Sequence, residues 1–207
     1  MFWLAKQQLK QGGFTLLEMV VVVTIVMIIT GVVISYVPAF RDRSGLDLVA
    51  QEIAVNVRGA QVFASGGKTL ASGVIFPNER PSYGIHFDKT ANTFSLFANV
   101  TDTGSDQYFN AEEGGDLVQE TRELSGLVFD SLCVNRGTSE EDCNGVELDI
   151  TYTRPSLQAA ICIRQTGGEW ECQNKDSATI LIRSPRSQQA KAITAYFNGQ
   201  IGVDNEN

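Results

Sequence analysis

The chain has 207 residues, a formal net charge of −8 and 43% hydrophobic residues. Once a terminal segment is set aside, this length allows one domain of roughly 140 to 150 residues, enough to bury a core. The acidic balance argues against broad, sequence-independent binding to nucleic acid, which needs clustered lysine and arginine.

The first thirteen residues contain Lys6 and Lys10 and no acidic residue. They resemble a positively charged leader that stays on the cytoplasmic side of a membrane while the rest of the chain is exported. An ordinary signal-peptidase site does not fit, because the small pair Gly12-Gly13 precedes the apolar run instead of following it. Cleavage after Gly13 would leave the apolar run on the mature protein and place a new α-amino group on Phe14.

From Phe14 to Val37 the only side chain charged at neutral pH is Glu18. As a helix, this segment would be roughly 36 Å long, enough to cross a hydrocarbon core of about 30 Å. A glutamate in the outer part of such a span costs roughly one to three kcal/mol, which predicts a cationic partner. The α-amino group on Phe14 of a neighbouring copy can be that cation. Because a buried unpaired charge is costly, the pair would also favour one axial stagger between neighbouring helices.

The segment from Lys10 to Glu18 resembles the class III signal of type IV pilins and type II secretion pseudopilins. The resemblance implies that a prepilin peptidase cuts between Gly13 and Phe14 and methylates Phe14, and that Glu18 is the acidic residue of the mature start. It also implies a single pass through the cytoplasmic membrane with the head outside, followed by entry into a filament. The implied partners are other subunits, the prepilin peptidase/methyltransferase, the inner-membrane assembly platform and, before assembly, membrane lipid. A plain signal anchor with a stray glutamate is the alternative.

After the apolar run, Pro38 predicts a kink or a local loss of helix, because proline removes a backbone donor. Ser44 and Asp47 form a capping-box-like start from which the helix is expected to resume, and Gly66-Gly67 is expected to end it. Apolar residues recur between these points at helical spacing, at Leu46, Val49, Ile53, Val57, Ala60 and Ala64. The helix of residues 14–65 thus has an apolar half and an amphipathic half that lays one stripe on a head.

Residues 66–207 change to a period of two. Tyr83, Ile85 and Phe87 alternate with less apolar residues, and a second strand begins at Phe94, which predicts a hairpin around the turn 89–92. Further strands are expected at 117–123, 126–134, 146–153, 159–164, 178–183, 192–197 and 200–203. A long helix packed on antiparallel strands is an α+β head. Its strand count resembles the pseudopilin H and minor-pilin class more than a small major pilin.

Four cysteines lie on the side expected to be exported, where disulfides persist. They are Cys133, Cys143, Cys162 and Cys172. Three connectivities are possible, and the equal spacing across two predicted turns favours Cys133 with Cys143 and Cys162 with Cys172. A zinc site is the competing interpretation, but the short spacings typical of such sites are missing.

An acidic segment, residues 99–113, does not fit the EF-hand pattern. A solvated acidic loop is the favoured interpretation, and an irregular calcium site using Asp102, Asp106 and Glu112 stays open. No catalytic residue, metal or cofactor is predicted. His86, the single histidine, is expected to face solvent from its strand, with no nucleophile motif or carboxylate dyad beside it in sequence.

Arg183, Arg186 and Lys191 form a modest basic cluster, of interest because some minor pilins bind DNA during uptake. A solvated edge is the favoured interpretation of three charges without flanking aromatics. The sequence therefore predicts a structural subunit, not an enzyme: a minor pilin or a pseudopilin. A DNA-binding minor pilin is the alternative, and a membrane-anchored hydrolase is a distant third.

Overall fold

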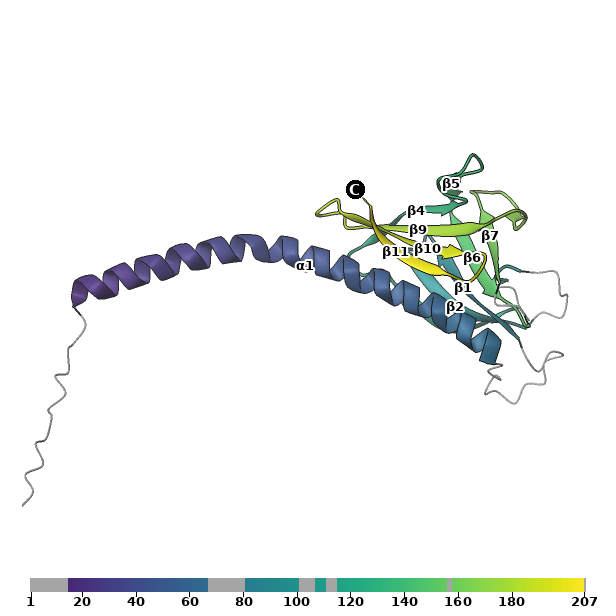
Figure 1. Cartoon of the computed structure of the whole chain (residues 1–207), viewed down its shortest axis with the longest axis horizontal. Coiled ribbons are helices and arrows are strands. Elements are labelled where there is room, and N and C mark those ends of the chain that lie inside the picture. Colours follow the sequence, from purple (N-terminus) through teal and green to yellow (C-terminus); the bar gives the residue numbers. More distant parts are fainter. Residues whose placement is uncertain (1–14, 67–80, 101–106, 111–114, 156–157, 207) are drawn as a thin grey trace, which may run out of the picture. The chain divides into compact units, whose positions relative to one another are not determined.

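The computed structural model describes residues 15–66, 81–100, 107–110, 115–155 and 158–206 (Figure 1). These residues form one long helix, α1 (Leu16–Gly66), and two antiparallel β-sheets, which is the α+β arrangement that the sequence predicts. The chain divides into two compact units, Met1–Arg41 and Asp42–Asn207, and the boundary falls inside α1. The second unit contains both sheets and the second half of α1.

Eleven strands are present among the described residues: β1 (Ser82–Asp88), β2 (Thr93–Asn99), β3 (Leu117–Glu123), β4 (Val128–Val134), β5 (Asp142–Gly145), β6 (Glu147–Tyr152), β7 (Ala159–Arg164), β8 (Trp170–Glu171), β9 (Ser177–Arg183), β10 (Ala190–Tyr196) and β11 (Ile201–Glu206). Sheet A has the order β3-β2-β1-β6-β7-β8, and sheet B has the order β11-β10-β9-β4-β5. The predicted hairpin of β1 and β2 is confirmed, with Phe87 opposite Phe94. The short strands β5 and β8 were not predicted, because four and two residues are too few to show the alternation of a strand.

Helix α1 begins with a cap at Thr15. The Thr15 hydroxyl oxygen accepts the backbone N–H of Glu18 at 3.3 Å, and this Thr-x-x-Glu spacing is that of a capping box. The predicted loss of helix at Pro38 and restart at Ser44 are wrong, because α1 is helical through both residues. Proline removes its own amide donor at a cost of about 3 kcal/mol, and a helix with many turns on each side can bear that loss. Helix α1 is described up to Gly66, and the residue that follows in the predicted stop, Gly67, lies outside the described residues.

The core of the second unit lies between the two sheets and one face of α1. The helix contributes residues that are essentially inaccessible to solvent, among them Leu46, Ala50, Ile53 and Val57. Sheet A contributes residues such as Phe87 and Ile150, and sheet B residues such as Ile180 and Ile193. The amphipathic spacing of the second half of α1 therefore predicted the packed face correctly.

Asn92 connects the β1–β2 turn to the segment that leads into β4. Its backbone has φ 57°, a left-handed conformation that asparagine tolerates better than most residues. Its side-chain amide donates to the carbonyls of Leu124 and Leu127, at 3.2 and 2.9 Å, and its oxygen accepts the N–H of Phe129 at 3.0 Å. One side chain thus ties a turn of sheet A to the start of sheet B.

Candidate functional site

The candidate site for processing and assembly is the start of α1. Gly13 and Phe14, the predicted cleavage and methylation residues, lie outside the described residues. Glu18 is exposed in the first turn of α1, where a carboxylate is favoured by the positive end of the helix dipole. Among the described residues, no ion pair of Glu18 is formed within the chain. Its carboxylate is therefore available to a cation from elsewhere.

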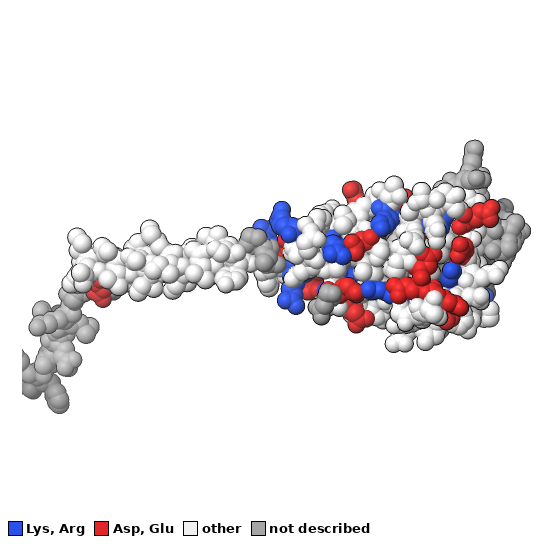
Figure 2. Space-filling model, turned by 90° about the horizontal axis from the view of Figure 1, so that it is seen from above, with Lys and Arg blue, Asp and Glu red and all other residues white. Residues whose placement is uncertain are grey.

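The apolar half of α1 is uncovered along its whole length. All the side chains from Leu16 to Val37 are exposed, for example Met27 at 69% and Ile34 at 64%. In Figure 2 this half of the helix has an almost unbroken uncharged surface, whereas the head carries charges of both signs. The helix is long and apolar enough to cross a membrane. So much exposed apolar surface requires a cover, either lipid or other protein.

A second apolar surface lies on the head half of α1. Leu48, Val55 and Val62 recur every seven residues and are 71%, 67% and 55% exposed. Because seven residues make almost two full turns, these side chains form one row along the helix. The row lies opposite the buried residues, since Val55 and the buried Val57 are two residues apart and point in nearly opposite directions. Gly59 lies in the same row, and a Cβ added there would meet no atom within 4 Å. We call these four residues, Leu48, Val55, Gly59 and Val62, the outer stripe.

All four cysteines form disulfides, in the pairs that the spacing favours. Cys133 of β4 is joined to Cys143 of β5, and Cys162 of β7 to Cys172, which follows β8. Cys133 and Cys143 lie near the carboxylate of Glu141, a grouping of residue types that can hold a metal ion. Their sulfur atoms, however, are already joined to each other in an S–S bond.

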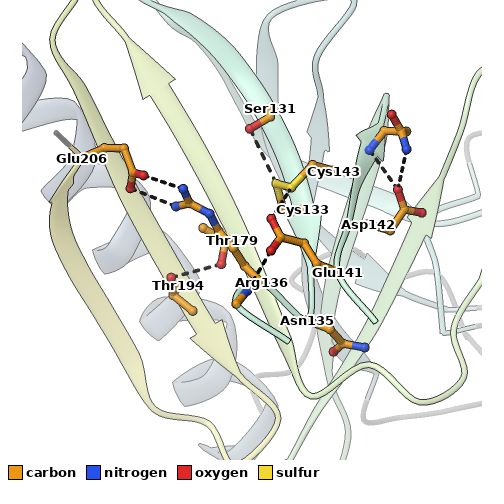
Figure 3. Close-up of a disulfide and its surroundings, with 12 residues drawn as sticks. Ser131, Cys133, Asn135, Arg136, Glu141, Asp142, Cys143, Thr179, Thr194 and Glu206 are labelled. Atoms are coloured by element: carbon orange, nitrogen blue, oxygen red, sulfur yellow. Dashed lines mark hydrogen bonds and ion pairs between the residues drawn. A yellow bond between two sulfur atoms is a disulfide. The ribbon is translucent and has the colours of Figure 1, made fainter. Parts of the chain in front are cut away.

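Beside the first disulfide, Arg136 reaches to Glu206 at the end of β11 and forms two hydrogen bonds with its carboxylate (Figure 3). The hydrogen bond from Arg136 lowers the pKa of Glu206 below its usual value. Thr179 and Thr194 are hydrogen-bonded to each other beside this pair. The loop closed by the Cys133–Cys143 disulfide is therefore fastened to the C-terminal strand of sheet B.

The basic cluster is neutralised by acidic residues from other elements. Arg183 donates to both carboxylate oxygens of Asp130, at 2.9 and 2.7 Å, and this hydrogen bonding lowers the pKa of Asp130. In the same cluster, the Lys191 amine lies 2.5 Å from Asp47 and the Arg186 guanidinium lies 3.7 Å from Asp42. Each of the three predicted cations thus has an acidic partner, which weakens the case for a DNA-binding patch.

His86 does not face solvent, so that prediction was wrong. It is only 9% exposed, and its Nδ1 lies 2.7 Å from Oδ1 of Asp149, a fully buried residue directly opposite on β6. The segment 107–110 covers this face of sheet A, so β1 is buried on both faces. A signal was present in the sequence, because Asp149 interrupts an apolar strand, but the pairing of strands 63 residues apart could not be read from it.

The pair of His86 and Asp149 does not extend to a nucleophile in the described contacts. The hydroxyl opposite His86 on β2 belongs to Ser95, which is hydrogen-bonded to Thr121 at 2.9 Å. The proposed calcium ligands Asp102, Asp106 and Glu112 lie outside the described residues. Nearby, the Asp116 carboxylate accepts the backbone N–H groups of Val100 and Asn110.

Comparison with known proteins gives one match. Residues 8–34 match the family described as the prokaryotic N-terminal methylation motif. Neither the curated proteins nor the solved structures gave a match. The matched segment includes Gly13, Phe14 and Glu18 and is a type IV pilin-like prepilin segment. The match supports a precursor of the pilin or pseudopilin type that is processed at its N-terminus.

Proposed function

We propose that the chain is a structural subunit, a minor pilin or pseudopilin, which is cleaved before Phe14 and assembled through α1 into a type IV pilus or a type II secretion pseudopilus. In this role it works as a building block and not as an enzyme. Its partners are other subunits, the prepilin peptidase and the inner-membrane assembly platform. Before assembly it is held in the cytoplasmic membrane with its head outside.

The uncovered apolar half of α1 is the observation that carries this proposal. Burying one valine, leucine or isoleucine side chain is worth roughly 1.5 to 3 kcal/mol, so a row of such residues between Leu16 and Val37 strongly favours any arrangement that covers it. Lipid covers it in the membrane. When the subunit leaves the membrane, another apolar protein surface has to take the place of lipid, and the same helix of other subunits supplies one.

The outer stripe offers one surface for such a helix. Leu48, Val55 and Val62 have the seven-residue spacing of helices that pack side by side, and Gly59 lets a second backbone come close. The pairing of the cations at Arg183 and Lys191 disfavours the DNA-binding alternative.

Glu18 sets the register of assembly in this proposal. In a bundle of apolar helices its carboxylate meets the terminal ammonium on Phe14 of a neighbour, and a shifted helix leaves both charges without a partner. In the membrane, by contrast, Glu18 is a cost for insertion. Removal of its charge should therefore affect assembly and leave insertion unchanged or slightly better.

Incorporation of Glu18→Ala and Glu18→Gln into sheared filaments, measured beside the wild type with the membrane level as reference, tests this role. Both variants should reach the membrane and fail to assemble, and the glutamine variant separates charge from shape. Thr24→Val is a matched control in the same helix, since the Thr24 hydroxyl donates to the carbonyl of Val20 one turn earlier in the helix. It should assemble normally. Normal incorporation of both Glu18 variants would contradict the assigned role.

A further inference from the structure

A short segment of the β2–β3 connection, Gln107–Asn110, is docked on the outer face of sheet A. The Thr151 hydroxyl donates to the carbonyl of Gln107 at 2.9 Å. The N–H of Phe109 donates to Oδ2 of Asp149 at 2.7 Å. The ring of Tyr108 stacks on Trp170 at 5.3 Å between centroids, with 12° between the ring planes. Polar and aromatic contacts thus hold Gln107, Tyr108 and Phe109 against β6 and β8.

These contacts converge on the buried pair of His86 and Asp149. One carboxylate oxygen of Asp149 faces His86 at 2.7 Å, and the other accepts the docked segment. The Phe109 ring lies over the His86 ring at 4.7 Å and also contacts Phe97 at 5.2 Å. Asp149 is fully buried, so its negative charge relies on the imidazole and on the Phe109 N–H for stabilisation.

The surroundings of the pair add further negative charge. The negative charges of Glu147 on β6 and Asp88 on β1 both favour the protonated form of His86. Arg164 on β7 is ion-paired with Glu147 and lies 5.2 Å over the Trp170 ring, and Tyr108 is the titratable residue of the docked segment. Burial lowers the pKa of His86, but the hydrogen bond and charge of Asp149, with Glu147 and Asp88, raise it above its ordinary value overall. Burial raises the pKa of Asp149, against the opposing effect of His86.

We propose that His86 and Asp149 form a proton-controlled latch that holds Gln107–Asn110 on sheet A and releases it as the pH rises. When the pair carries one proton, it is neutral as a whole and can stay buried under Phe109. When that proton is lost, a negative charge remains in a dry site next to Glu147 and Asp88. Undocking of Phe109 then admits water to Asp149, which lowers the cost of the charge.

The sign of the pH dependence follows from His86. Because its pKa is raised in the folded state, the stabilisation is fully present below the unfolded value of about 6.5 and is lost as the pH rises through the higher folded value. Release is therefore expected as the pH rises beyond the unfolded value of about 6.5.

Two probes of docking are available in the full-length chain in detergent micelles. The sequence has two tryptophans, Trp3 and Trp170, so Trp3→Phe leaves Trp170, which stacks on Tyr108, as the single tryptophan, and excitation at the red edge of its absorption avoids the tyrosines. The second probe is the hydrogen-exchange protection of the Phe109 amide, corrected for the intrinsic effect of pH. The amide of Ile150, in the middle of β6, reports global folding.

Between pH 6 and pH 9 we expect the protection of Phe109 to fall at least tenfold and the Trp170 emission to shift to longer wavelength, while Ile150 stays protected. Asp149→Asn keeps the shape of the side chain without the charge, and it should reduce the change to less than twofold. His86→Gln leaves the carboxylate without a cation, and the segment should be loosely held even at pH 6.

A flat pH profile of Phe109 in the wild type would overturn the latch, and so would an equal loss of protection at Ile150. An unchanged pH profile in a folded Asp149→Asn chain would overturn it as well. If Asp149→Asn does not fold, as judged at Ile150, the wild-type profile and His86→Gln decide the question. In that case a His86→Gln chain with wild-type protection of Phe109 at pH 6 contradicts the proposal.

Discussion

Val55 and Val57 lie two residues apart on α1, with Val55 on the exposed face of the helix and Val57 on the face that packs against the sheets. Val57 is 0% exposed, so Val57→Ala removes two buried methyl groups at about 0.8 kcal/mol each and leaves a small cavity. The expected loss in the free energy of unfolding is about 2 kcal/mol. Val55 is 67% exposed, so Val55→Asp gives up only about a third of a comparable burial, or about 0.5 kcal/mol.

The new carboxylate in Val55→Asp has little effect on the helix itself. Valine and aspartate have similar helix propensities, and Glu52 at i−3 and Arg58 at i+3 act on the new charge with opposite signs. In an assembled filament, however, the same carboxylate would have to enter an apolar contact at the outer stripe, at a cost of about 2 kcal/mol or more. We therefore expect at least a tenfold drop in incorporation at nearly unchanged stability.

Urea unfolding of the fragment from Asp42 onward measures the stability, and the amount of subunit in sheared filaments measures assembly. Val57→Ala should lose stability and still assemble at a temperature where it is folded. Val55→Asp should show the reverse. If Val55→Asp enters filaments like the wild type, the outer stripe is not a contact surface. If Val57→Ala fails to assemble while folded, the two faces of the helix have been assigned the wrong roles.

Three further predictions concern processing and the stability of the head. Gly13→Val should block cleavage by a prepilin peptidase, because a branched side chain crowds the scissile bond, and the wild-type mature chain should begin at Phe14 by intact mass; a mature start beyond the apolar run would refute this. Reduction should lower the free energy of unfolding by roughly 2 to 4 kcal/mol per disulfide, and thiol counting before reduction should find no free cysteine. Asn92→Ala loses three hydrogen bonds and strains a positive φ, so it should lower the free energy of unfolding in urea by about 3 to 5 kcal/mol. Asn92→Gly also loses the hydrogen bonds but tolerates the positive φ, so it should recover about 1 kcal/mol of that loss. Equal losses in the two variants would refute a role for the backbone conformation.

Local patterns predicted much of this fold. The alternation of Tyr83, Ile85 and Phe87 located the first hairpin, and the helical spacing from Leu46 to Ala64 located the packed face of α1. Such patterns report how one element is buried, and they work where burial is one-sided. They did not predict β5 and β8, because strands of four and two residues are too short to show a period.

The errors come from contacts between distant parts of the chain. His86 looked exposed because alternation assigns one face of a strand to solvent, whereas Phe109 covers that face here. Asp149 became its partner only through the register of β1 and β6. The acidic partners of the basic cluster were not visible in the sequence for the same reason, since Asp130, the partner of Arg183, is 53 residues away. At the N-terminus the motif itself carried the inference, and the fold adds the surfaces through which a subunit could pack.

Each disulfide lies at one of the two edge strands of a sheet, at β5 in sheet B and directly after β8 in sheet A. An outermost strand presents unpaired backbone groups, which can recruit a strand from another molecule and start aggregation. Here each of these strands is short, and its covalent tie keeps it from peeling away to uncover the longer strand behind it. If heads are crowded together on a membrane, as the proposed function requires, they are guarded on these two edges against the pairing that leads to amyloid-like fibres.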